Sequence, residues 1–61
     1  MSALALTLGP ATVGHRPVLA GGRVVALVRA DRDLVEALSE LAARGYCVSY
    51  RDSVPYLLVA E

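Results

Sequence analysis

The chain consists of short alternating or apolar runs, interrupted once by a stretch with helical spacing. In the central run, residues 22–30, apolar side chains occupy both parities from Val24 to Val28. A continuous run of Val, Leu and Ala is typical of a strand that is covered on both faces. Because this run leads directly into the helical stretch, we expect the other segments to be arranged around these two elements.

The helix is predicted to begin after Asp31 or Asp33, either of which can act as its N-cap, and to stop at Gly45. Asp33 and Glu36 have the spacing of a capping box, in which each side chain binds the other residue's backbone N–H. Glycine favours the positive φ that ends many helices. The apolar stripe expected to face the sheet consists of Leu34, Leu38, Leu41 and Ala42, widened by Val35 and Ala37.

The N-terminal segment, residues 2–8, alternates large and small side chains and is predicted to be a strand with its three leucines on one face. Gly9-Pro10 is a turn signal. We expect a loop over residues 14–17, with Pro17 at the start of an edge strand, where a missing N–H does no harm.

Two hairpins are predicted. Residues 17–20 and the central run flank Gly21-Gly22, which can supply the positive φ angles of a two-residue turn. Residues 46–51 and 55–60 flank a polar turn and are expected to pair antiparallel.

The order of elements predicts a single small α+β domain over residues 1–61, of the form β-β-(β)-α-β-β. It has a mostly antiparallel sheet of four to five strands, with one helix packed on one face. One short helix covers only one face of such a sheet. If Val24, Ala26 and Val28 lie under the helix, the open face carries the interface residues that we predict, namely Val25, Leu27, Arg29, Arg51 and Leu58.

Length and composition indicate that this open face needs a partner. A chain of 61 residues buries only about 60% of the surface that it exposes when unfolded. Its hydrophobic fraction is nevertheless 56%, against about 45–50% in an ordinary domain. Cys47 is the only cysteine, so no disulfide can form within the chain. We therefore expect a homo-oligomer or a subunit of a larger protein assembly.

Charge gives no general attraction to nucleic acid or to anionic membranes, because six arginines balance six acidic residues. No apolar stretch approaches the ~18–20 residues of a membrane span. The apolar residues 1–8 lack the basic segment of a signal peptide and end at Gly9-Pro10. The protein is expected to be soluble and cytoplasmic, without a membrane association.

The residues with chemical potential do not form a recognisable catalytic set. His15 is expected to be a solvated loop residue, and Cys47 a packed residue in a strand. Neither has an acid, a nucleophile or a second ligand at a telling spacing, so we predict no catalytic residue, no metal and no cofactor. No resemblance to a known family emerges from these residues.

The sequence therefore favours a non-enzymatic structural or interaction protein that acts through an apolar sheet face. The alternative is a small regulatory protein that binds nucleic acid through an arginine-edged sheet face with aromatic platforms. That surface would comprise Arg16, Arg23, Arg29 and Arg51 with Tyr50 or Tyr56.

Overall fold

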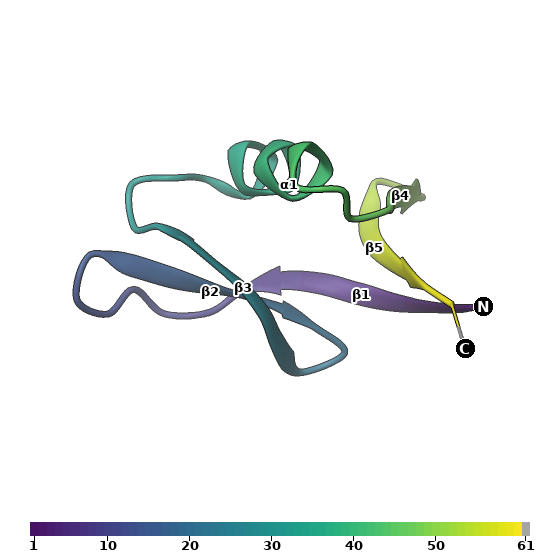
Figure 1. Cartoon of the computed structure of the whole chain (residues 1–61), viewed down its shortest axis with the longest axis horizontal. Coiled ribbons are helices and arrows are strands. Elements are labelled where there is room, and N and C mark those ends of the chain that lie inside the picture. Colours follow the sequence, from purple (N-terminus) through teal and green to yellow (C-terminus); the bar gives the residue numbers. More distant parts are fainter. Residues whose placement is uncertain (61) are drawn as a thin grey trace.

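The computed structural model describes residues 1–60, which form five strands and one helix (Figure 1). This arrangement confirms the predicted α+β class. In chain order the elements are β1 (Ser2–Leu8), β2 (His15–Ala20), β3 (Arg23–Arg29), α1 (Leu34–Ala43), β4 (Val48–Arg51) and β5 (Val54–Val59).

The strands form one antiparallel sheet in the order β3-β2-β1-β5-β4. Each half of the central strand β1 pairs with a different hairpin. Residues 6–8 of β1 pair with residues 18–20 of β2, and residues 2–5 pair with residues 56–59 of β5. The hairpins are therefore offset along β1, and Figure 1 shows them diverging from its two ends.

Local sequence signals define both ends of α1. The Asp33 carboxylate accepts the backbone N–H of Glu36 (2.8 Å), and the Glu36 carboxylate accepts that of Asp33 (3.1 Å), which confirms the capping box. At the other end Gly45 has φ +98°, and the N–H of Tyr46 donates to the Leu41 carbonyl at 3.1 Å. This is the hydrogen-bond pattern of a glycine-terminated helix.

The core lies between α1 and one face of the sheet. On the helix it uses a narrower stripe than the spacing predicts, because Val35 and Ala42 are exposed. The buried hydrophobic residues of the core are Leu6, Val18, Ala20, Val28, Ala37, Leu38, Leu41 and Leu57.

Within residues 1–60, no helix is long and apolar enough to cross a membrane.

A β-bulge in β3 places two valines on the faces of the sheet opposite to those predicted. Ala26 pairs with Val18, but the next pair is Val24 with Leu19, so Val25 is an extra residue without a direct partner. An extra residue reverses the alternation of side chains that follow it. As a result Val25 packs against the core, whereas Val24 joins the open face. The predicted placement of Val25 on the open face is therefore wrong.

Two side chains at and just after the C-terminal end of α1 form hydrogen bonds with the bulged edge strand β3. The Tyr46 hydroxyl donates to the Val25 carbonyl at 3.1 Å, and the Arg44 guanidinium donates to the Leu27 carbonyl at 3.3 Å. Carbonyls at a sheet edge otherwise offer a site for strand addition. These two side chains therefore occupy part of the β3 edge.

Pro17 lies inside an inner strand, not at the start of an edge strand or in a loop as predicted. It is tolerated because β1 has ended beside it. The N–H of Gly9 donates to the Pro17 carbonyl (2.9 Å), but Pro17 has no N–H to return to the Gly9 carbonyl. The Arg16 guanidinium supplies that bond instead, at 3.1 Å.

Replacing Arg16 by methionine is therefore expected to lower the free energy of unfolding by about 1 kcal/mol or more, because the carbonyl of buried Gly9 loses its donor. Urea unfolding followed by circular dichroism measures the change. Arg23→Met at the exposed hairpin end is the matched control and should stay within about 0.5 kcal/mol of the parent. Equal stability of the two variants would show that the Arg16 bond contributes nothing.

Candidate interaction surface

The face of the β2–β3 hairpin that points away from α1 carries a cluster of apolar side chains, here called the apolar patch. Its members are cross-strand neighbours, because Leu19 pairs with Val24 and Pro17 with Leu27. Val24 is 60% exposed and Leu27 is 55% exposed. Their cross-strand partners Pro17 and Leu19 are partly buried. Two large aliphatic side chains thus stand in water beside each other.

The predicted interface residues of β3 divide between three environments. Leu27 lies in the apolar patch, and Val25 packs against the core. Arg29 ends the strand and lies 3.1 Å from the Asp31 carboxylate, with which it forms an exposed ion pair. Of these three residues only Leu27 therefore contributes to an apolar surface.

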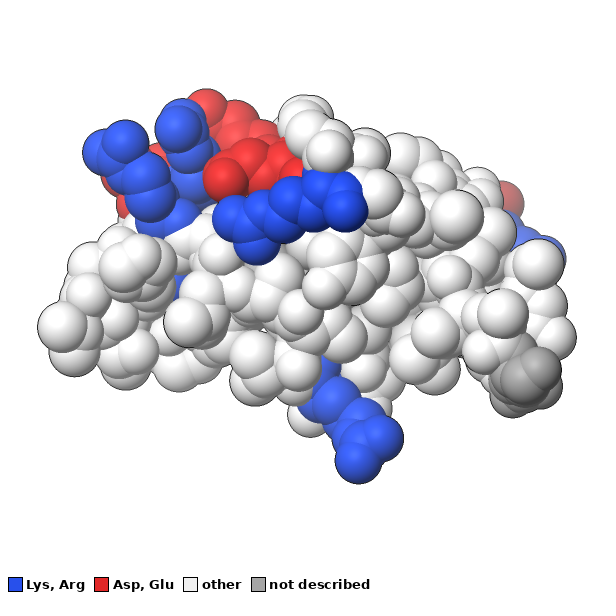
Figure 2. Space-filling model, viewed as in Figure 1, with Lys and Arg blue, Asp and Glu red and all other residues white. Residues whose placement is uncertain are grey.

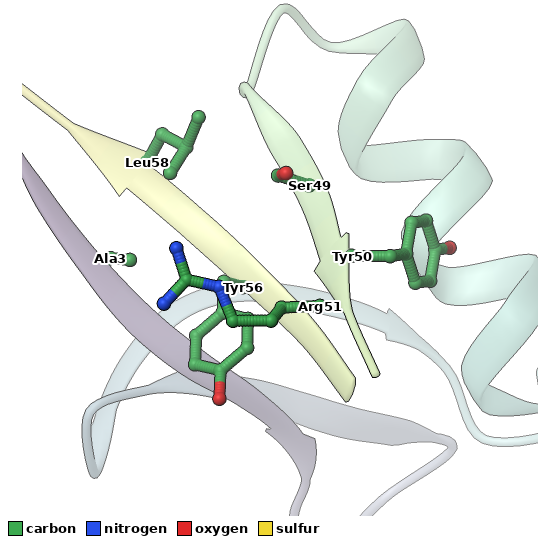
Figure 3. Close-up of a pocket in the computed structure, with 6 residues that line it drawn as sticks. All are labelled: Ala3, Ser49, Tyr50, Arg51, Tyr56 and Leu58. Atoms are coloured by element: carbon green, nitrogen blue, oxygen red, sulfur yellow. The ribbon is translucent and has the colours of Figure 1, made fainter. Parts of the chain in front are cut away.

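The other two predicted interface residues, Arg51 and Leu58, lie on the opposite half of the sheet. They line a hollow of about 270 Å³ together with Ala3, Ser49, Tyr50 and Tyr56 (Figure 3). The exposed residues Ala5 and Thr7 of β1 lie between the hollow and the apolar patch. The open face therefore has an apolar half and a half that carries a positive charge.

Most charged side chains gather around the helix instead. Arg32 lies 3.4 Å from the Glu36 carboxylate and 3.5 Å from that of Glu40, which also lies 3.5 Å from Arg44. Figure 2 shows these red and blue groups side by side over α1, whereas most of the remaining surface in that view is uncharged. The charges of the helix are thus largely neutralised within the chain.

Neither His15 nor Cys47 lies in a pocket or in a cluster of catalytic groups among the described residues. His15 is exposed, with its ring Nδ1 3.3 Å from the Val13 carbonyl. Cys47 is exposed just before β4, so the prediction that it packs within a strand is wrong. In the part of the chain that the structure describes, no three His, Cys, Asp or Glu side chains are grouped as a metal ion would require.

Sequence reasoning missed part of the apolar patch and most of the hollow. The type of residue could not distinguish Val24 from Val25, since only the bulge exchanges their faces. The hollow results from small residues on β1 and β4 beside larger ones on β5, and the pairing of β1 with β5 joins segments at opposite ends of the chain.

No family model matches the chain, and comparison with curated proteins and with solved structures gave no match either.

Proposed function

We propose that the chain is a non-enzymatic structural or interaction protein that works as a homo-oligomer, in which the apolar patch of one copy packs against a second copy. The observation that carries the proposal is the exposure of Val24 and Leu27 beside each other on the face that α1 leaves open. Contiguous exposed apolar surface is a common feature of protein–protein contact sites.

The size of the core supports the need for a partner. The chain has eight buried hydrophobic side chains among its described residues, and two of these are alanine, which buries little apolar surface. A standard interface buries about 800 Å² on each partner, roughly a fifth of the 4077 Å² that this chain exposes. Covering that area would add to a stability that is marginal in domains of this size.

A second copy suits the patch because the patch requires no charge of opposite sign. Its four members are uncharged, and the acidic residues of the helix already lie beside arginines. Sheets pack face to face at about 10 Å, with side chains of the two faces interdigitating. A two-fold contact would therefore give layers in the order helix, sheet, sheet, helix.

Nucleic-acid binding is the less favoured function. Affinity for nucleic acid depends mainly on free positive charge facing the phosphates. Of the four arginines in the predicted binding surface, Arg29 pairs with Asp31 and Arg16 binds the Gly9 carbonyl. Only Arg23 and Arg51 have no such contact among the described residues.

Replacing Leu27 by aspartate is expected to weaken self-association at least about tenfold, because each copy loses an apolar contact and gains a charge in the interface. Sedimentation equilibrium over a range of concentrations measures the association constant. The parent chain should exceed the 6.4 kDa of one copy.

Val35→Asp is the matched control, since Val35 is 69% exposed but lies on the helix. This variant should associate as the parent does. A parent chain that sediments as a monomer at all concentrations, or equal weakening by both substitutions, would contradict the proposal.

A further inference from the structure

The hollow on the other half of the open face is formed by side chains of β1, β5 and β4. Tyr56 pairs with Ala5 on one side and with Ser49 on the other, while Leu58 pairs with Ala3. The small side chains of Ala3 and Ser49 thus lie beside the larger ones of β5. This alternation of small and large side chains across three strands leaves the space of about 270 Å³.

Arg51 supplies the charge of the hollow. Figure 3 shows its side chain extending from β4 back across β5 towards Ala3, while the Tyr50 ring points the other way, towards the helix. Among the described residues, those that line the hollow include no acid. Among residues 1–60, Arg51 has no ion pair or side-chain hydrogen bond, in contrast to Arg32 and Arg44 at the two ends of the helix.

An unneutralised guanidinium beside apolar walls is a specific chemical environment. The planar guanidinium group binds carboxylate and phosphate oxygens through two parallel N–H donors. Ser49 adds a hydroxyl donor, and Tyr56 and Leu58 add a flat and an aliphatic surface. Binding sites commonly combine such apolar walls with a few polar groups that fix the orientation of the ligand.

We propose that this hollow binds a small organic anion, with a carboxylate or phosphate group on Arg51 and a compact aromatic or aliphatic body against Tyr56 and Leu58. The volume suits a molecule of about one ring, since sites for drug-sized ligands begin near 300 Å³. A nucleic-acid strand fits less well, because Arg51 is the only cation among the described residues of the lining. The inference does not rest on the proposed self-association, since no member of the apolar patch lines the hollow.

The test is a titration of the ¹⁵N-labelled chain with benzoate, phenyl phosphate and neutral benzamide, followed by amide chemical shifts. We expect benzoate or phenyl phosphate to give saturable shifts at residues 49–51 and 56–58, and the tighter of the two identifies the anionic group. Benzamide should bind at least about tenfold more weakly, because it lacks the charge-assisted hydrogen bond.

Arg51→Gln should weaken binding of the anion by about tenfold or more. Arg23→Gln is the matched control, because Arg23 is also exposed, with no acidic partner in the described part of the chain, but lies at the end of the other hairpin. Leu27→Asp should leave the affinity unchanged, which separates this site from the self-association surface. The proposal is overturned if neither anion gives saturable shifts, if benzamide binds equally well, or if Arg51→Gln binds as the parent does.

Discussion

Leu41→Ala is expected to lower the free energy of unfolding by about 2–5 kcal/mol, a large part of the stability of this protein. Leu41 is fully buried, with 0% of its side chain exposed, and it is one of the three largest fully buried residues. Truncating a buried leucine to alanine costs about 2–5 kcal/mol, because contacts are lost and a cavity remains. At ~0.05–0.15 kcal/mol per residue, a chain of 61 residues has a total stability of roughly 3–9 kcal/mol. One substitution can therefore remove most of it.

Thermal and urea unfolding, followed by far-ultraviolet circular dichroism at one protein concentration, measure this effect. A fixed concentration matters because self-association would raise the apparent stability. Val35→Ala is the matched control, since it truncates an exposed aliphatic residue of the same helix and should stay within about 0.5 kcal/mol of the parent. If Leu41→Ala unfolds with the same midpoint as Val35→Ala, the proposed core is incorrect.

The elements whose signals are local were predictable from the sequence. The helix begins at a capping box made by Asp33 and Glu36, and both interactions form within three residues. The turn Gly21-Gly22 has positive φ at both positions, as the hairpin prediction requires. In each case the residues that determine the geometry are neighbours in the chain, so their pattern is visible in the sequence.

The sheet order and the bulge were not predictable, because both depend on distant contacts. The pairing of β1 with β5 joins residues 2–5 with residues 56–59. Nothing in the local sequence marks Val25 as the bulged residue. Its carbonyl accepts a hydrogen bond from the hydroxyl of Tyr46, which follows the helix in the chain. The sequence therefore predicted that one face of the sheet is open and that Leu27 lies on it, but it placed Val25 on the wrong face.

The charge state of the surface was equally invisible in the sequence. Six arginines have the same side chain, but three lie beside carboxylates and a fourth, Arg16, binds a backbone carbonyl, as Arg44 also does. Which arginines remain for a ligand depends on which acids the fold brings near them. This is why Arg51 could be predicted at the margin of the face but not in a hollow.

Gly9→Ala is expected to destabilise the protein by about 1–3 kcal/mol, the usual cost of forcing extra volume into a packed site. A Cβ on Gly9 would lie 2.6 Å from Cγ of Pro17 and 3.6 Å from Cδ1 of Leu19. The first distance is well inside van der Waals contact, and the proline ring has little freedom to move away. Relief therefore requires the backbones of Gly9 and Pro17 to separate, which weakens their 2.9 Å hydrogen bond.

A double-mutant cycle with Pro17→Ala tests this mechanism. Pro17→Ala removes the Cγ atom that the new methyl group meets, and it restores an N–H beside the Gly9 carbonyl. The two substitutions should therefore be less costly together than their sum, with a coupling of about 0.5 kcal/mol or more, as found for residues in contact. Urea unfolding of the parent, both single variants and the double variant gives the coupling. Strict additivity would mean that the ring does not cause the cost, and that Gly9 is needed for some other reason than its close approach to Pro17.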